Sequence, residues 1–188
     1  MTLFLTIAVY LLILPLIAFI WNGITLYNSL VQVRLNVDVA WANIDVLLKR
    51  RHDELDKLID AVKSYMGYEK DVLERLTQLR GEAVGMGAGL AQMRCESEIT
   101  PTIGRLFIAA EKYPQLRASE NFMQLQREIM QLETQIAHRR ELYNDAVNVN
   151  NARMEQFPAS LLATIAGLRQ RRLFIASDEE KQAFRIAL

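Results

Sequence analysis

The first 33 residues of this chain contain no charged side chain. Within them, residues 3–21 read LFLTIAVYLLILPLIAFIW, which matches the length of a helix that crosses the hydrocarbon core of a bilayer. Aromatic residues such as Trp21 and Tyr27, placed just after such a run, are typical of the headgroup region. We therefore expect residues 1–26 to form a transmembrane anchor, with Trp21 and Tyr27 at the membrane interface.

Two alternatives to an anchor exist for this segment. A cleaved signal peptide would carry basic residues ahead of the apolar run, but only Met1 and Thr2 precede it. A buried core helix would rarely combine a terminal position with so long an uncharged stretch. The basic residues follow the run, beginning with Arg34, so the sequence predicts a translocated N-terminus and a cytoplasmic body.

The remainder of the chain has the composition of a water-soluble domain. It holds all 22 Lys and Arg and all 22 Asp and Glu residues, so the formal net charge is zero. This balance argues against a nucleic-acid-binding protein, which would normally carry a basic excess. The single cysteine, Cys95, excludes an intramolecular disulfide and fits a reducing compartment.

Long helices are predicted for this body. The segments 24–66 and 115–157 each lack both glycine and proline, whereas strands would need frequent turn signals. A heptad-like apolar stripe runs from Tyr27 to Leu79, so we expect one helix over residues 22–80, about 90 Å long and continuous with the anchor. Gly67 alone need not end it.

Polar residues on the seams of the long helices are candidates for helix pairing. Buried polar groups at seam positions can set register and partner choice. We hypothesise that Arg51 and Glu69 pair with charges of a neighbouring helix or subunit. The candidate helix-pairing or oligomer-interface residues are Trp41, Arg51, Glu69, Arg139, Asn150 and Arg153. An asparagine-rich run, Asn144, Asn148, Asn150 and Asn151, is interpreted as a hydrogen-bonding face between helices.

The remaining helix boundaries follow from glycine, proline and capping residues. The segment GEAVGMGAG, residues 81–89, predicts a flexible turn at the distal tip. A helix over 90–112 follows, in which Thr100-Pro101 marks either a helix start or a kink. Ser119 is expected to cap a third helix that Pro158 stops, ahead of a short helix over 159–168.

The unequal helix lengths lead to a prediction about assembly. The first helix is much longer than the second, so part of its apolar stripe lacks a partner within the chain. Exposed apolar surface is unfavourable by roughly 25 cal/mol per Å². We therefore expect a homo-oligomer in which neighbouring first helices pack side by side.

The sequence offers no motif for catalysis, a cofactor or a metal. His52 lies in KRRHDELD, where position 56 is Asp, so the HExxH zinc motif is absent. His138 is far away in the sequence, and Cys95 has no neighbouring histidine to activate it. We expect no catalytic, cofactor-binding or metal-binding residues and a protein that is not an enzyme.

Three ordered motifs resemble the LemA family of bacterial membrane proteins. They are YNSLVQVRLNVDVAWANIDVLLKRRHDELDKLIDAVKSY at 27–65, GRLFIAAEKYPQLRASENFMQLQREI at 104–129 and RRELYNDAVNVNNARMEQFP at 139–158. The resemblance implies an all-α fold: a single N-terminal transmembrane helix, continuous with a long helix in an antiparallel, coiled-coil-like bundle over residues 27–168. It implies no defined reaction, although some relatives are linked to magnetosome membranes and others sit beside a membrane metalloprotease.

Two departures from the family pattern affect these expectations. The frequent Leu-Ile-Pro-Asn is replaced by Glu54–Lys57, so a kink there should be absent. The usual tail is replaced over residues 169–188, where Arg169, Arg171 and Arg172 are candidates for contact with anionic headgroups.

We expect a scaffold at the bacterial inner membrane that shapes membrane or protein patches, with the lipid bilayer and a second copy as partners. The alternative is an adaptor or regulator of another inner-membrane protein, such as a protease or sensor complex.

Overall fold

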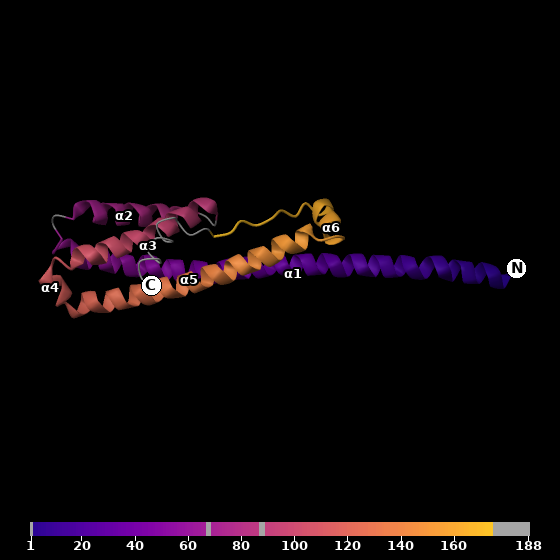
Figure 1. Ribbon diagram of the computed structural model, residues 1–188, viewed down its shortest axis with the longest axis horizontal. Helices are drawn as coiled ribbons and strands as arrows, with labels where there is room; N and C mark the ends of the chain where they lie inside the picture. The colour runs from indigo at the N-terminus through magenta and orange to yellow at the C-terminus, as the bar shows by residue number, and fades with distance from the viewer. Residues whose placement is uncertain (1, 67–68, 87–88, 175–188) are drawn as a thin grey trace. The chain divides into compact units, whose positions relative to one another are not determined.

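The computed structural model describes residues 2–66, 69–86 and 89–174, and within these residues it contains six helices and no strand (Figure 1). The expected all-α class is therefore confirmed. The described residues form two compact units, one within residues 1–39 and 145–171 and the other within residues 40–144 and 172–188. The helices are α1 (Thr2–Lys63), α2 (Lys70–Gly85), α3 (Leu90–Ala110), α4 (Pro114–Arg117), α5 (Glu120–Glu155) and α6 (Ala159–Ile165).

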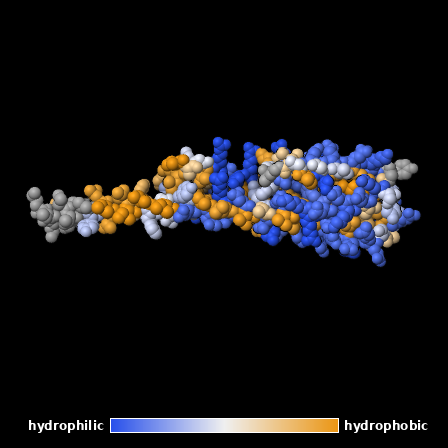
Figure 2. Space-filling view, turned by 180° about the vertical axis from the view of Figure 1, so that it is seen from behind, coloured by the Kyte–Doolittle hydropathy of each residue, from blue (hydrophilic) through white to orange (hydrophobic). Residues whose placement is uncertain are grey.

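Helix α1 carries the apolar N-terminal run. It is long and apolar enough to cross a membrane, and none of its most apolar stretch is buried inside the protein. Figure 2 shows this stretch as hydrophobic surface at the N-terminal end of α1. No break separates the run from the rest of the 62-residue helix, and Glu54–Lys57 lie within it. The expected continuity between the anchor and a long helix is confirmed.

The first unit has a small core where α6 packs against α1. Leu30 of α1 is fully buried against Ala159 and Ala163. Alanine at these two positions allows the helices to approach closely. Leu162 and Leu168 cover the edges of this contact.

The second unit has the larger core, and five helices contribute to it. Leu55 and Leu58 of α1 are completely buried there, with Leu76 of α2, Ile99 of α3 and Ile129 of α5. Leu116 joins them from the short α4. These residues recur every three or four positions on their helices, as an apolar face should.

The uninterrupted helix predicted over residues 22–80 is wrong. Helix α1 ends at Lys63, where the backbone N–H groups of Tyr65 and Met66 both donate to the carbonyl oxygen of Val62 at 3.0 Å. The chain then returns as α2. This reversal places the apolar face of α2, with Leu76, in the core that Leu58 occupies, instead of extending it into water. Gly67 lies outside the described residues.

This reversal also corrects the position of the glycine-rich turn. Helix α2 continues through Gly81 and Gly85, so the break lies between Met86 and Gly89, at the opposite end of α2 from the reversal. It is not at a distal tip. Pro101 lies inside α3, so Thr100 is not an N-cap. Ser119 does precede α5, and its hydroxyl oxygen accepts from the N–H of Phe122 at 3.5 Å.

Candidate functional site

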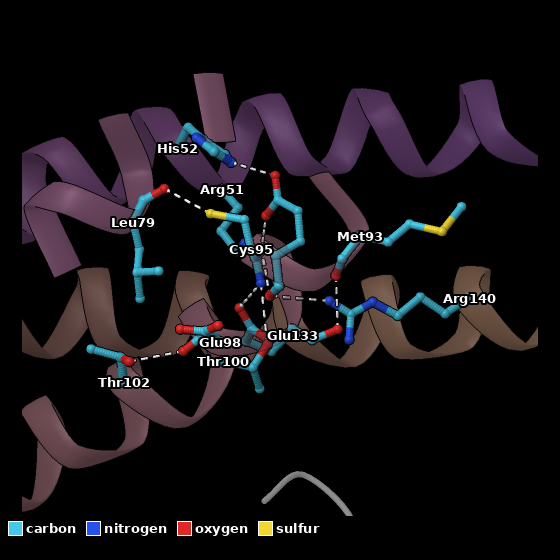
Figure 3. Close-up of polar contacts among 12 residues, drawn as sticks. Arg51, His52, Leu79, Met93, Cys95, Glu98, Thr100, Thr102, Glu133 and Arg140 are labelled. Carbon is cyan, nitrogen blue, oxygen red and sulfur yellow. Dashed lines mark hydrogen bonds and ion pairs between the residues drawn. The ribbon is translucent and has the colours of Figure 1, made fainter. Parts of the chain in front are cut away.

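A fully buried arginine lies at the centre of the second unit. Arg51 has 0% of its surface exposed, although the apolar Leu48 and Leu55 flank it on the buried face of α1. Its Nη1 donates to Glu133 Oε1 of α5 at 2.9 Å and to Thr100 Oγ1 of α3 at 3.2 Å. Its Nη2 forms an ion pair with the carboxylate of Glu96. One guanidinium therefore joins α1, α3 and α5 (Figure 3).

Glu96 of α3 is the most connected acid of this network. One carboxylate oxygen pairs with Arg51, and the other, Oε1, lies 2.9 Å from His52 Nε2. Its backbone carbonyl accepts from Arg51 Nη2 at 3.3 Å and from Arg140 Nη2 at 3.4 Å. Thr100 donates to the other oxygen of Glu133 at 2.7 Å, which completes a connected set of polar groups.

The network keeps both Glu96 and Arg51 charged. Burial alone would raise the pKa of Glu96, but the hydrogen bond from His52 and the charge of Arg51 hold this pKa below its ordinary value. Burial would lower the pKa of Arg51, but the carboxylates of Glu133 and Glu96 raise it above its ordinary value. Removing one of these charged partners would therefore leave the other charge buried without a counter-charge.

His52 borders a cavity in the same unit. Because a carboxylate only accepts, Nε2 of His52 carries the proton that is shared with Glu96. Its other nitrogen, Nδ1, is buried and has no hydrogen-bond partner among the residues that the structure describes. The cavity has a volume of about 240 Å³ and a mixed lining of charged and apolar side chains. These are Asp45, Leu48, Lys49, His52, Asp53, Arg80, Ala83, Val84, Met86, Gln92 and Glu96.

The state of Cys95 argues against a nucleophilic role for its thiol. Cys95, next to Glu96, donates its S–H to the carbonyl oxygen of Leu79, and burial raises the pKa of its thiol to about 11. A thiol in this state is a poor nucleophile. The part of the chain that the structure describes has no group of three His, Cys, Asp or Glu residues arranged to hold a metal ion.

The residues predicted from the helix seams lie in different environments. Arg51 is in the buried network. Glu69 lies just ahead of α2 instead of on a continuous first helix, and its carboxylate accepts from Lys112 at 3.0 Å. Arg139 is exposed, and its neighbour Arg140 is buried in its place. Helix α5 is rotated by one residue from the expected register at this point.

The other residues predicted from the helix seams also include both buried and exposed side chains. Trp41 packs edge-on against Tyr143, with ring centroids 5.6 Å apart, and stacks on Phe174 at 6.1 Å. Asn150 is buried and donates to Asn151 Oδ1 at 3.1 Å. Arg153 is exposed. Whether these residues contact a second copy stays a prediction.

The membrane-interface candidates all lie at least partly on the surface. Trp21, Tyr27, Arg169 and Arg172 are exposed. Arg171 is half-buried, and its guanidinium donates to Asp38 Oδ1 at 2.8 Å. Of the three candidate arginines, Arg169 and Arg172 are thus the more accessible to headgroups.

Two asparagines of α5 bind an extended segment that runs from Arg171 to Phe174. The sequence did not predict this contact. Asn151 accepts from the N–H of Arg171 at 2.9 Å and donates to its carbonyl at 2.8 Å. Asn144 does the same with Phe174, at 2.7 and 3.0 Å. The asparagine run therefore hydrogen-bonds to an extended segment and does not form the expected face between helices. Seven helical residues and three extended ones both span about 10 Å, a match in spacing that could have suggested this pairing.

Comparison with known proteins assigns the chain to a family. The model of the LemA family matches residues 40–187. The chain belongs to the LemA family. Magnetosome protein MamQ 2 of Paramagnetospirillum magneticum is 22% identical, over 86% of this chain and 69% of the relative. Protein LemA of Metamycoplasma hominis is 26% identical, over 82% of this chain and 71% of the relative.

The part that matches the LemA family contains the whole buried network. Arg51, Glu96 and Glu133 all lie within residues 40–187, as does the cavity beside His52. The apolar run of α1 precedes the match. The family assignment therefore rests on the bundle and is independent of the membrane anchor.

Proposed function

We propose that this LemA-family protein is a non-enzymatic scaffold, anchored in the bacterial inner membrane by α1, that assembles side by side with copies of itself. The observation that carries the proposal is an apolar face of α1 that no other part of the described chain covers. Val39 and Val46, seven residues apart on α1, are 61% and 66% exposed. Leu35, four residues before Val39, is also exposed.

Helix geometry supports a role for this face. Positions 35, 39 and 46 share one side of a helix, opposite the buried Val37 and Ile44. Leu142 and Val149 repeat the seven-residue spacing on α5 and are also exposed. Apolar residues at heptad spacing are the residues through which helices of separate chains pack.

The buried Arg51 network supports the scaffold in a second way. It joins three helices through charged groups that are costly to separate, so each copy presents a rigid face to its neighbour. The thiol of Cys95 and the ion-paired Glu96 are both in states that favour structure over reactivity. Relatives named as magnetosome proteins are compatible with a role at a membrane compartment.

Purification of the full chain in mild detergent tests this proposal. We expect particles of several copies for the wild type and a shift toward monomer when Val39→Gln and Val46→Gln are combined. Asn43→Gln is the matched control, because it places the same side chain at an exposed position beside Val39 and Val46 without removing an apolar group. A monomeric wild type would contradict the scaffold, and its recovery in fixed ratio with another membrane protein would favour an adaptor instead.

A further inference from the structure

Helix α6 has two apolar faces, and only one of them is packed. Ala159 and Ala163 are buried against Leu30 of α1. On the other side, Phe157, Leu161 and Ile165 are 81%, 58% and 82% exposed. These three residues are spaced four positions apart, so the two on α6 share one side of the helix, and Phe157 lies two residues before its start. Figure 2 shows hydrophobic surface at the position of α6.

The segment around α6 is free of charge. No Asp, Glu, Lys or Arg occurs over residues 156–168. The hydroxyl of Thr164 donates to the carbonyl oxygen of Ser160 at 2.9 Å, so its donor is already satisfied within the helix. A surface of large apolar side chains without charges is poorly suited to water and well suited to the boundary between headgroups and acyl chains.

The contact with Leu30 fixes the position of α6 along α1, and therefore its depth relative to the bilayer. The uncharged part of α1, from Thr2 to Val33, is about 48 Å long as a helix. A bilayer with its headgroups is about 40–45 Å thick. If this part spans the bilayer, the first charged residue lies at the outer edge of the headgroups, and Leu30 lies about 6 Å inside it. Ala159 and Ala163 are held at the same level by their contact.

Charge on the following segment agrees with this level. Arg169 and Arg172 come directly after the apolar run, and both are exposed. Basic residues next to an apolar helix are attracted to anionic headgroups. Arg171 is engaged with Asp38 and therefore anchors the segment to α1.

We propose that α6 and Phe157 form an interfacial element, in which Phe157, Leu161 and Ile165 insert into the headgroup boundary of the bilayer that α1 crosses. The chain then contacts the membrane at two places. This inference rests on the membrane anchor of the proposed function but does not require self-assembly.

Depth-dependent fluorescence quenching in vesicles tests the insertion. The full chain, with Cys95→Ala as background, carries an environment-sensitive dye at Leu161→Cys or at Ile165→Cys. The vesicles contain equal parts of phosphatidylcholine and phosphatidylglycerol, with a nitroxide quencher on the acyl chain. Asn148→Cys is the matched control, since Asn148 is an exposed residue of the same unit and is not one of the exposed apolar residues proposed to contact a second copy. We expect several-fold stronger quenching at both α6 positions than at Asn148.

Several outcomes would overturn the proposal. One is quenching at Leu161 and Ile165 that equals the quenching at Asn148. Another is a shielded dye whose signal depends on the protein-to-lipid ratio, which would indicate that a second copy covers α6. Both labelled proteins must show the circular dichroism spectrum of the wild type. Labelling at two positions shows whether a result arises from a local structural change at one of them. A negative result here leaves the particle mass in detergent, and hence the scaffold proposal, untouched.

Discussion

At the scale of single residues, burial distinguishes two adjacent arginines of α1. Arg51 is completely buried and bound to two carboxylates, whereas Arg50 is exposed. Arg51→Met leaves Glu96 and Glu133 without their cation, so we expect a loss of about 3–5 kcal/mol in the free energy of unfolding. Arg50→Met is the matched control and should change it by less than about 0.5 kcal/mol. Chemical denaturation followed by circular dichroism measures both, and equal losses would show that the network contributes nothing special.

Glu96, the buried acidic partner of Arg51, leads to a prediction about how the stability of the protein depends on pH. The pKa of Glu96 is lower in the folded protein than its ordinary value of 4.5. The unfolded chain therefore takes up this proton first as the pH falls. The stability that Glu96 contributes is complete above the unfolded pKa and is lost as the pH falls through the folded one. We expect the gap in unfolding free energy between wild type and Glu96→Gln to be largest near neutral pH and to shrink below about pH 4.5. A gap that is constant down to pH 3 would contradict this assignment.

The sequence identified Arg51 but not its partners. Heptad spacing placed Arg51 on an apolar seam, and a charge in that position needs a counter-charge. Glu96 and Glu133 lie 45 and 82 residues further along the chain, in no recognisable motif. Their proximity depends on how α3 and α5 pack, which periodicity along one helix does not specify. His52, for which the sequence shows no zinc motif, joins the same network because α3 brings Glu96 beside it.

At the scale of elements, the end of α1 shows where a propensity argument fails. One glycine costs a helix only about 1 kcal/mol, so residues 64–69 gave no strong stop signal. The reversal is instead set by packing, because it buries Leu73, Leu76 and Leu79 of α2 in the main core. Each buried leucine contributes about 1.5–3 kcal/mol, which exceeds the local preference for a continuous helix. Tertiary burial, which a single-helix pattern cannot reveal, decides the turn.

The extended segment bound to α5 gives a prediction at this scale. Each of Asn144 and Asn151 makes two hydrogen bonds to the backbone of the segment, and each bond contributes about 1 kcal/mol. Combining Asn144→Ala with Asn151→Ala should therefore raise the population in which this segment is detached from α5 by roughly tenfold or more. Limited trypsin digestion, read by mass spectrometry, should show faster cleavage after Arg171 and Arg172.

Asn148→Ala is the matched control for this experiment. Asn148 is exposed on the same helix, so the change alters helix propensity equally without removing the same backbone contacts. Equal cleavage rates in the control and the double variant would mean that the asparagines do not hold the segment. Trp41 and Arg140, which both contact Phe174, would then be the residues that retain it.

At the scale of the whole molecule, the two ends of the anchor differ in charge. Met1 and Thr2, ahead of the apolar run, carry no charged side chain, whereas Arg34, Lys49, Arg50 and Arg51 follow it. Orientation is set mainly by basic residues within about 15–20 positions of the span, so Arg34 carries most of this bias. The bias is thus weak and should be easy to reverse.

Reporter fusions at the C-terminus can measure this orientation. For the wild type, we expect a fluorescent green fluorescent protein fusion and an inactive alkaline phosphatase fusion, because the basic residues after the span predict a cytoplasmic body and phosphatase needs an oxidising compartment for its disulfides. A short run of lysines inserted after Thr2 should raise phosphatase activity, since it moves the basic excess to the other end of the span. A run of glutamines of the same length is the control and should leave both readouts unchanged. Active phosphatase on the wild-type chain would contradict the predicted orientation, because it would place the bundle and its buried network outside the cytoplasm.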